Sequence, residues 1–206
     1  MASHDPFMVD SSQTFLSLRL DTPRTIVRMG TTDDVPSIIG YYSQNREHLR
    51  PFDPERPAFF YEERFWRIQV RQSVDDFAAD RCLRLFVFLQ SAPDHVIGNI
   101  GFSSFVRGVG QSCNLGYSIA ADHEGQGLMF EALRPTINYV FETLHFHRIE
   151  ANYLPHNRRS GGLLRRLGFQ VEGYARDYLM INGQWEDHIR TALLNPRWLT
   201  HPATGY

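Results

Sequence analysis

The chain has 206 residues, a formal net charge of −2, 42% hydrophobic residues and 13% aromatic residues. This length is typical of one domain with a sizeable core, and the aromatic content excludes a mainly disordered chain. The nearly balanced charge gives no general attraction to nucleic acid or anionic lipid. We therefore expect neither DNA nor a membrane as a partner.

Apolar segments and cysteines indicate a cytoplasmic protein. The most apolar run, residues 83–89, contains Arg84 and is far shorter than the ~20 residues that span a bilayer. Residues 1–10 show no basic segment followed by an apolar one, so no secretory signal is visible. Cys82 and Cys113 form neither a metal-binding spacing nor a disulfide framework, which suits a reducing compartment.

All 21 basic residues are arginine, and lysine does not occur. Codon bias in a GC-rich genome explains this composition. Avoidance of acceptor amines on the surface of a self-modifying enzyme explains it too, and the sequence leaves both explanations open.

The first half of the chain predicts a strand followed by two helices. Residues 1–20 alternate weakly and indicate a short edge strand, and residues 25–28 are typical of a first full strand. An acidic stretch with an early proline predicts a helix over 31–49. A proline-rich loop follows at 50–57, and apolar residues at helical spacing predict a second helix over 59–77.

The middle of the chain predicts an antiparallel meander. Three apolar runs with strand periodicity occupy residues 83–89, 95–105 and 113–119. Turn residues separate them at Pro93–Asp94 and at Arg107–Gly110. Short connections of this kind join neighbouring antiparallel strands.

The last third predicts alternating strands and helices, closed by a hairpin. In chain order, we expect a helix after Gly127, a strand over 148–154, a helix over 160–167, and strands over 169–181 and 184–194 around an Asn182–Gly183 turn. The whole pattern predicts one α/β domain over residues 23–195, with a mixed, mostly antiparallel sheet flanked by helices. Residues 1–22 are expected to form an N-terminal extension and residues 196–206 a C-terminal tail.

A glycine-rich turn at the end of the third meander strand is the strongest candidate for a binding site. Gly125 and Gly127 lie between that strand and an amphipathic helix. Backbone N–H groups at a helix start, with glycines that allow close approach, suit a pyrophosphate. A purely structural turn stays open, because Gly-x-Gly turns at helix starts are common. The segment lacks the Lys-Ser/Thr of a Walker A loop and the third glycine of a Rossmann motif.

A second motif opens the short helix that follows. Asn157-Arg-Arg-Ser160 precedes Leu163-Leu164 and Leu167-Gly168-Phe169. With the turn at 124–129, this order resembles the two signatures of the Gcn5-related N-acetyltransferase superfamily. Residues 95–193 are most similar to the RimJ-type ribosomal-protein-alanine acetyltransferases, through stretches such as Leu115-Gly-Tyr-Ser-Ile119 and Gly183-Gln-Trp185.

The resemblance implies an acyltransferase that moves acetyl from acetyl-CoA to a primary amine. It points to a protein N-terminal α-amine, in particular the N-terminal alanine of a small-subunit ribosomal protein. A small-molecule or aminoacyl-conjugate acetyltransferase of the antibiotic self-protection type is an alternative. A non-enzymatic ribosome-assembly factor that keeps acetyl-CoA as a structural ligand is another. We expect a monomer or a weak dimer.

The resemblance also assigns site residues. Residues expected to bind acetyl-CoA lie in the third meander strand, the glycine turn, the helix after it and the second motif: Tyr117, Ser118, Ile119, Glu124, Gly125, Gln126, Gly127, Leu128, Met129, Phe130, Asn157 and Arg165. Backbone N–H groups around 117–119 are expected to polarise the thioester carbonyl. No metal is expected, since His145 and His147 lack a third ligand at suitable spacing.

Two departures from the family pattern affect the predicted chemistry. Glu124 stands where Gln or Arg is usual, so it must turn away from the pyrophosphate and leave the backbone amides of 126–130 to bind it. Leu164 stands where many relatives place a tyrosine that protonates the leaving thiolate. Ser160 is therefore expected to donate a hydrogen bond to that thiolate.

The general base is the least determined residue of the predicted site. Glu172 and Asp177 are the candidates by family position. The alternative is that both are ordinary strand carboxylates, paired with arginine or solvated, in which case a water chain would deprotonate the amine. Arg158, Arg159, Arg165 and Arg166 suit either contacts with the phosphates of CoA or a solvated basic face.

Overall fold

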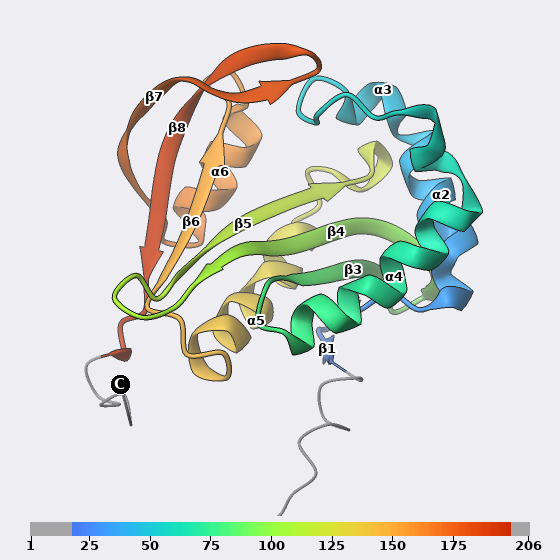
Figure 1. The fold of residues 1–206 in the computed structure, drawn as a ribbon, viewed down its shortest axis with the longest axis horizontal. Helices are drawn as coiled ribbons and strands as arrows, with labels where there is room; N and C mark the ends of the chain where they lie inside the picture. Colours follow the sequence, from blue (N-terminus) through green and yellow to red (C-terminus); the bar gives the residue numbers. More distant parts are fainter. Residues whose placement is uncertain (1–17, 199–206) are drawn as a thin grey trace, which may run out of the picture.

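One eight-stranded sheet forms the centre of the protein, as described by a computed structural model for residues 18–198 (Figure 1). Its strand order is β1-β2-β3-β4-β5-β6-β8-β7. The pairing of β5 with β6 is parallel, and every other neighbouring pair is antiparallel. The strands are β1 Arg19–Asp21, β2 Thr25–Arg28, β3 Leu83–Leu89, β4 Ala92–Val106, β5 Ser112–Ile119, β6 Arg148–Tyr153, β7 Gln170–Ile181 and β8 Gln184–Leu194. This confirms the predicted mixed, mostly antiparallel sheet.

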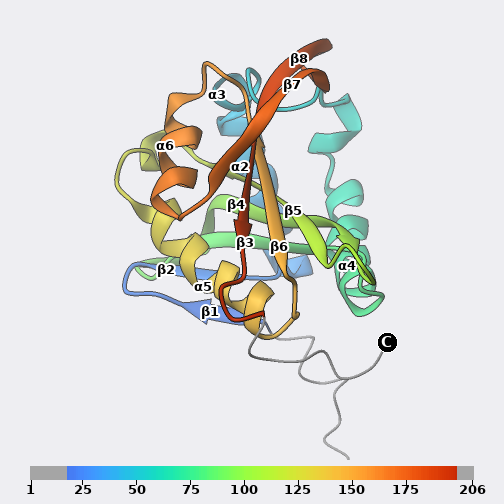
Figure 2. The same cartoon turned by 90° about the vertical axis from the view of Figure 1, so that its left-hand side faces the viewer.

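Helices cover both faces of the sheet (Figures 1 and 2). The α-helices are α2 Val35–Gln44, α3 Arg46–Leu49, α4 Glu63–Ala78, α5 Leu128–Glu142 and α6 Arg158–Arg166, and the 3-10 turns are η2 Thr32–Asp34, η3 Ala58–Tyr61 and η4 Ala121–His123. Helices α5 and α6 pack on one face, and α2 and α4 pack on the other. No helix in the part of the chain that the structure describes is long and apolar enough to cross a membrane.

Strand β3 shows why the most apolar run of the sequence belongs in the middle of this sheet. Leu85 and Val87 face the core beneath α5, while Phe86 and Phe88 face the core beneath α2 and α4. Successive side chains of a strand point to opposite faces, so a strand covered on both sides needs apolar residues throughout. Each fully buried side chain of this size stabilises the fold by about 1.5–3 kcal/mol.

Three predicted boundaries were wrong. The turn between β3 and β4 lies at Gln90–Ser91 instead of Pro93–Asp94. The predicted helix over 31–49 is broken at Asn45, whose side chain donates to the carbonyl of Tyr41 and accepts from the N–H of Ala121. The second predicted helix begins only at Glu63, because Glu62 is extended (ψ 141°) after a 3-10 turn.

The N-terminal boundary also differs from the predicted domain limit. Strand β1 lies inside the stretch expected as an extension, yet it pairs with β2 along its length. In the described residues the sheet begins at Arg19, and only the last residues of the expected edge strand over 1–20 can be compared with it. The rest of the predicted extension, up to residue 17, and most of the predicted tail lie outside the described residues.

Candidate active site

The sheet splits between β5 and β6. These two strands pair only at Ser112–Asn114 with Arg148–Glu150. Strand β5 then continues beside β4 as far as Ile119, while β6 continues beside β8 as far as Tyr153. The strands therefore diverge into a fork, visible in Figure 1, and the segments that follow them carry the two predicted motifs.

The glycine turn, residues 124–127, lies between β5 and α5. Gly125 and Gly127 have φ angles of 71° and 77°, a region that glycine adopts readily and other residues rarely. Gly127 is the N-cap of α5 and supplies no capping side chain. The first amides of α5 are thus left to an external acceptor, and the helix dipole favours an anion there.

Glu124 is neutralised by neighbours from two other helices. Its carboxylate forms an ion pair with Arg159 of α6, and its second oxygen lies 3.5 Å from Nε2 of His48 in α3. These contacts occupy both oxygens of the carboxylate with side chains of α3 and α6. An anion at the glycine turn therefore meets a paired carboxylate.

Arg24 supports the same turn, and the sequence analysis did not find it. Its guanidinium donates to the carbonyl of Gln126 (3.1 Å) and pairs with Glu131 of α5 (2.7 Å). Glu131 also accepts from the backbone N–H of Arg24 (2.7 Å). Nothing local in the sequence marks this contact, which joins residues more than 100 positions apart.

The second motif caps helix α6 and places Ser160 beside the fork. The side chain of Asn157 accepts a hydrogen bond from the N–H of Ser160 (3.1 Å), as an N-cap residue does. Next to it, a Cβ on Gly161 would lie 2.7 Å from the ring of Tyr153, so this turn of α6 approaches β6 closely. Leu164, at the position of the family tyrosine, is 1% exposed and belongs to the core.

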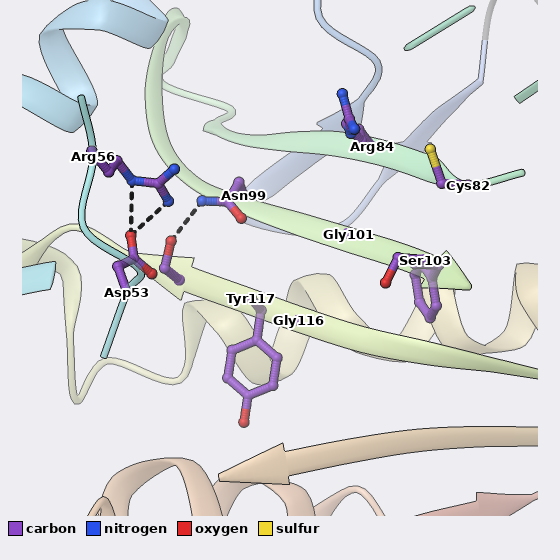
Figure 3. Close-up of a pocket in the computed structure, with 11 residues that line it drawn as sticks. Asp53, Arg56, Cys82, Arg84, Asn99, Gly101, Ser103, Gly116 and Tyr117 are labelled. Atoms are coloured by element: carbon purple, nitrogen blue, oxygen red, sulfur yellow. Dashed lines mark hydrogen bonds and ion pairs between the residues drawn. The ribbon is translucent and has the colours of Figure 1, made fainter. Parts of the chain in front are cut away.

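Tyr117 bridges the fork. It projects from β5, and its hydroxyl lies 2.9 Å from Oγ of Ser160. Figure 3 shows its ring pointing away from β4. Burial raises the pKa of Tyr117 to about 12, although the hydrogen bond with Ser160 acts in the opposite direction. The sequence analysis selected Tyr117 for its strand and did not foresee this contact of its side chain.

A cavity of about 280 Å³ lies on the face of the sheet that α2 and α4 cover, opposite the face that carries α5 and α6 (Figure 3). It is lined by Asp53, Arg56, Cys82, Arg84, Asn99, Gly101, Phe102, Ser103, Gly116, Tyr117 and Ser118. We call it the β4–β5 cavity. Its floor contains Gly101 and Gly116, which are directly opposed on β4 and β5. A Cβ on either would meet nothing within 4 Å, so the floor is open above both glycines.

Polar groups of the β4–β5 cavity are largely hydrogen-bonded or ion-paired to one another. Ser118 lies within 2.8 Å of the Tyr41 hydroxyl and accepts from Asn99 (2.6 Å). Among the described residues that line the cavity, Asp53 is the one carboxylate, and it pairs with Arg56 at 2.7 Å. The carbonyl of Asp53 accepts from the N–H of Asn182, at the tip of the β7–β8 hairpin. The proline-rich loop and the hairpin therefore meet beside the cavity.

The two predicted bases lie outside the residues that line this cavity. Glu172 pairs with Arg148, at the closed end of the fork, and the hydrogen bonds from Arg148 lower the pKa of its carboxyl. Asp177 is exposed in a bulge of β7, with a φ angle of 46°. Its N–H donates to Asp187 (2.8 Å). A lowered pKa makes Glu172 a weaker base.

The remaining predicted residues divide between the core and the surface. Leu128 and Met129 are buried and anchor α5, while Arg165 is exposed on α6. The guanidinium of Arg166 lies 4.4 Å from the centre of the Phe130 ring. Between residues 18 and 198, no three His, Cys, Asp or Glu side chains gather as metal ligands.

An uncapped helix start that favours an anion, beside a fork in the sheet, is an arrangement that suits a group-transfer enzyme with a phosphate-bearing donor. Residues 24–170 match the family model for the acetyltransferase (GNAT) domain. The chain belongs to this acetyltransferase family, and acetyl-CoA is its acetyl donor.

Three relatives show how far the similarity extends. The [ribosomal protein uS5]-alanine N-acetyltransferase of Escherichia coli is 44% identical over 181 residues, which cover 88% of this chain and 93% of that enzyme. A probable N-acetyltransferase of Bacillus subtilis, YjcK, is 34% identical over 82% of this chain and 93% of its own length. The crystal structure of the ribosomal-protein-S5-alanine acetyltransferase from Vibrio fischeri is 32% identical, with a TM-score of 0.84 over 88% of this chain and 98% of that one.

Proposed function

We propose that this acetyltransferase modifies the N-terminal α-amine of a protein, and that the N-terminal alanine of ribosomal protein uS5 is its acceptor. The observation that carries the proposal is the 44% identity with the Escherichia coli uS5-alanine enzyme over 93% of that enzyme's length. The region shared with that enzyme includes both the glycine turn, where we place the donor, and the β4–β5 cavity, where we place the acceptor. A ribosomal acceptor implies a cytoplasmic enzyme.

We place the acceptor amine in the β4–β5 cavity, and the proton chemistry of this acceptor cavity supports an α-amine. An α-amine has a pKa of about 8 and a lysine side chain one of about 10.4. At pH 7.5, about a quarter of α-amines are therefore neutral and reactive, compared with about 0.1% of lysines. Asp53, the one carboxylate among the described lining residues, is paired with Arg56, so the cavity suits an amine that needs little help to lose its proton.

The floor of the cavity supports a small first residue. Gly101 and Gly116 let an acceptor backbone approach the sheet closely, and an N-terminal alanine adds only a methyl group there. The exposed side chains of Met180 and Trp185, near the tip of the β7–β8 hairpin, offer apolar contacts to the residues that follow in a peptide.

The arrangement of the glycine turn, β5 and the start of α6 supports separate roles for these segments in binding the donor and in catalysis. Amides of residues 126–130 would hold the pyrophosphate of acetyl-CoA, assisted by Gly125 and Gly127. Backbone N–H groups at 117–119 would polarise the thioester carbonyl, and Ser160 would donate a hydrogen bond to the sulfur as it departs. Asn157 would act by capping α6 and holding Ser160 in place.

Acetylation of a synthetic peptide tests the proposal. The purified protein is incubated with acetyl-CoA and a peptide carrying the N-terminal sequence of uS5 from the same organism, and the product is read by mass spectrometry. We expect one acetyl group on the α-amine. A peptide of the same sequence with a blocked N-terminus and an added internal lysine is the matched control, and we expect it to stay unmodified.

A panel of amino acids, polyamines and aminoacyl conjugates separates the alternatives. Acetylation of a member of this panel, without acetylation of the peptide, would overturn the proposed acceptor. Saturable binding of acetyl-CoA without release of free CoA thiol with any amine would instead indicate a non-enzymatic role.

A further inference from the structure

We propose that Tyr117 is a positioning residue for the release of CoA: its hydroxyl donates to Oγ of Ser160 and so directs the single Ser160 hydroxyl proton toward the departing sulfur. The inference rests on the proposed role of Ser160 as the donor to that sulfur. It assigns a role to the Tyr117 side chain, which extends from β5 to α6.

The distances favour one hydrogen bond between these residues. The Tyr117 hydroxyl lies 2.9 Å from Oγ of Ser160 and 3.4 Å from the Ser160 carbonyl oxygen. Hydrogen bonds between two oxygens are strongest at about 2.5–3.0 Å, so the side-chain oxygen is the partner. A serine hydroxyl has one proton and two lone pairs. If Tyr117 donates, Ser160 keeps its proton free for another acceptor.

The acidity of the two hydroxyls favours this direction. A phenol is a stronger acid than an aliphatic hydroxyl and is therefore the better hydrogen-bond donor of the pair. Donation also requires that Tyr117 keeps its proton, and burial raises the pKa of its hydroxyl to about 12. Deprotonated Tyr117 would accept the Ser160 proton and withdraw it from the fork.

The backbone of Ser160 is already fixed by its neighbours. Asn157 accepts from the Ser160 N–H, and Gly161 packs so closely on Tyr153 that a Cβ would not fit. The Ser160 side chain can then still rotate about χ1, and its hydroxyl proton can rotate about the C–O bond. The hydrogen bond with Tyr117 restricts both rotations. A donor that is oriented before the reaction needs no reorganisation as charge develops.

The step balances without an additional reactant. The neutral amine nitrogen forms a bond to the acetyl carbon, the carbon–sulfur bond breaks, and its electron pair goes to sulfur. The proton of the amine leaves to solvent. Ser160 and Tyr117 keep their own protons and only donate hydrogen bonds, because both are far weaker acids than a thiol of pKa about 8.5.

Tyr117 also supplies a phenol to α6 in a chain that lacks the family tyrosine. The position of that tyrosine is occupied by Leu164, which is buried in the core. The Tyr117 phenol reaches Ser160 of α6 from β5, on the other side of the fork. The resulting pair joins β5 and α6 across the gap in the sheet.

A double-mutant cycle tests the proposal with Tyr117→Phe, Ser160→Ala and the combined variant. Tyr117→Phe keeps the ring and removes one hydroxyl, so we expect kcat to fall about 5–10-fold with a KM for acetyl-CoA within twofold of the wild type. Ser160→Ala is expected to lower kcat by about 10²-fold. In the Ser160→Ala background, Tyr117→Phe should then have no further effect, because the group that it positions has gone.

Tyr139→Phe, the same change in the partly buried part of α5, is the matched control and should leave kcat unchanged. Two results would overturn the proposal: effects of Tyr117→Phe and Ser160→Ala that multiply, or a rise in KM that accounts for the whole loss in Tyr117→Phe. Either would assign Tyr117 to packing or donor binding.

Hydrolysis of acetyl-CoA in the absence of any amine provides a second readout. This slow reaction also requires departure of the thiolate, and it does not depend on the acceptor. A wild-type protein that hydrolyses acetyl-CoA but ignores the uS5 peptide would refute the proposed acceptor, while the cycle, measured on hydrolysis, would still decide the role of Tyr117.

Discussion

Replacement of Gly116 by alanine is expected to stabilise the protein and to impair the enzyme. Gly116 lies in β5, opposite Gly101, and no atom lies within 4 Å of the position that a Cβ would occupy. Its φ angle lies outside the left-handed region that favours glycine, so alanine fits the strand without strain. The added methyl group projects into the β4–β5 cavity, where we place the first residue of the peptide.

The two effects have different magnitudes. Glycine within a strand is about 0.5–1 kcal/mol less stable than alanine, which corresponds to a rise in Tm of about 1–4 °C for a chain of this size. One methyl group in a fitted pocket changes binding by about 1–3 kcal/mol. We therefore expect kcat/KM for the peptide to fall by about 5- to 150-fold, with an unchanged KM for acetyl-CoA.

Thermal unfolding and release of CoA thiol measure both quantities on one preparation. Gly40→Ala is the matched control: it lies in α2, where a Cβ also meets no atom within 4 Å, and it should raise Tm without changing kcat/KM. At Gly98, in contrast to Gly40 and Gly116, there is no room for alanine, because a Cβ would lie 2.6 Å from the carbonyl oxygen of Ser118. An unchanged kcat/KM in Gly116→Ala would refute our placement of the acceptor.

Three further substitutions test the supporting structure. Burial opposes ionisation of Asp34, but hydrogen bonds from Arg28 and Thr31 outweigh this effect and lower the pKa of its carboxyl. The ionised carboxylate therefore stabilises the folded protein at neutral pH, and this contribution to stability is lost as the pH falls through the folded pKa. Asp34→Asn should therefore lower Tm at pH 7 by about 4–8 °C, for a loss of about 2 kcal/mol, and the difference should shrink below pH ~4, as differential scanning calorimetry would show; a difference independent of pH would contradict this reasoning. Glu124→Gln frees Arg159 and removes a charge from the glycine turn, so the KM for acetyl-CoA should fall about two- to fivefold, whereas a rise would show that Glu124 mainly holds the turn in place. Glu172→Gln should leave kcat within twofold of the wild type, and a hundredfold loss would identify Glu172 as the base.

Local signals in the sequence were sufficient for the sheet and the glycine turn. Asn182–Gly183 predicted the β7–β8 turn, and both residues have positive φ angles, as such turns require. Gly125 and Gly127 predicted the uncapped start of α5 for a similar reason. These features depend on conformations that few residues adopt, so residue type alone reveals them.

Contacts between distant segments could not be predicted in this way. The bond between Tyr117 and Ser160 depends on how far the fork opens and on where α6 packs. The opposition of Gly101 and Gly116 depends on the register of β4 and β5, which a shift of one residue would abolish. Arg24 supports the glycine turn from a segment that carries no motif. The sequence therefore indicated the glycine turn, whose conformation the structure confirms, better than the cavity beside Gly101 and Gly116.

The proposed sites place donor and acceptor on opposite faces of the sheet. In this arrangement the donor would approach from the side of α5 and α6, the acceptor would approach from the side of α2 and α4, and the two routes would meet at β5. An acceptor as bulky as a ribosomal subunit would thus leave the exit of spent CoA uncovered. Turnover would then not require the large partner to leave before the small one is exchanged.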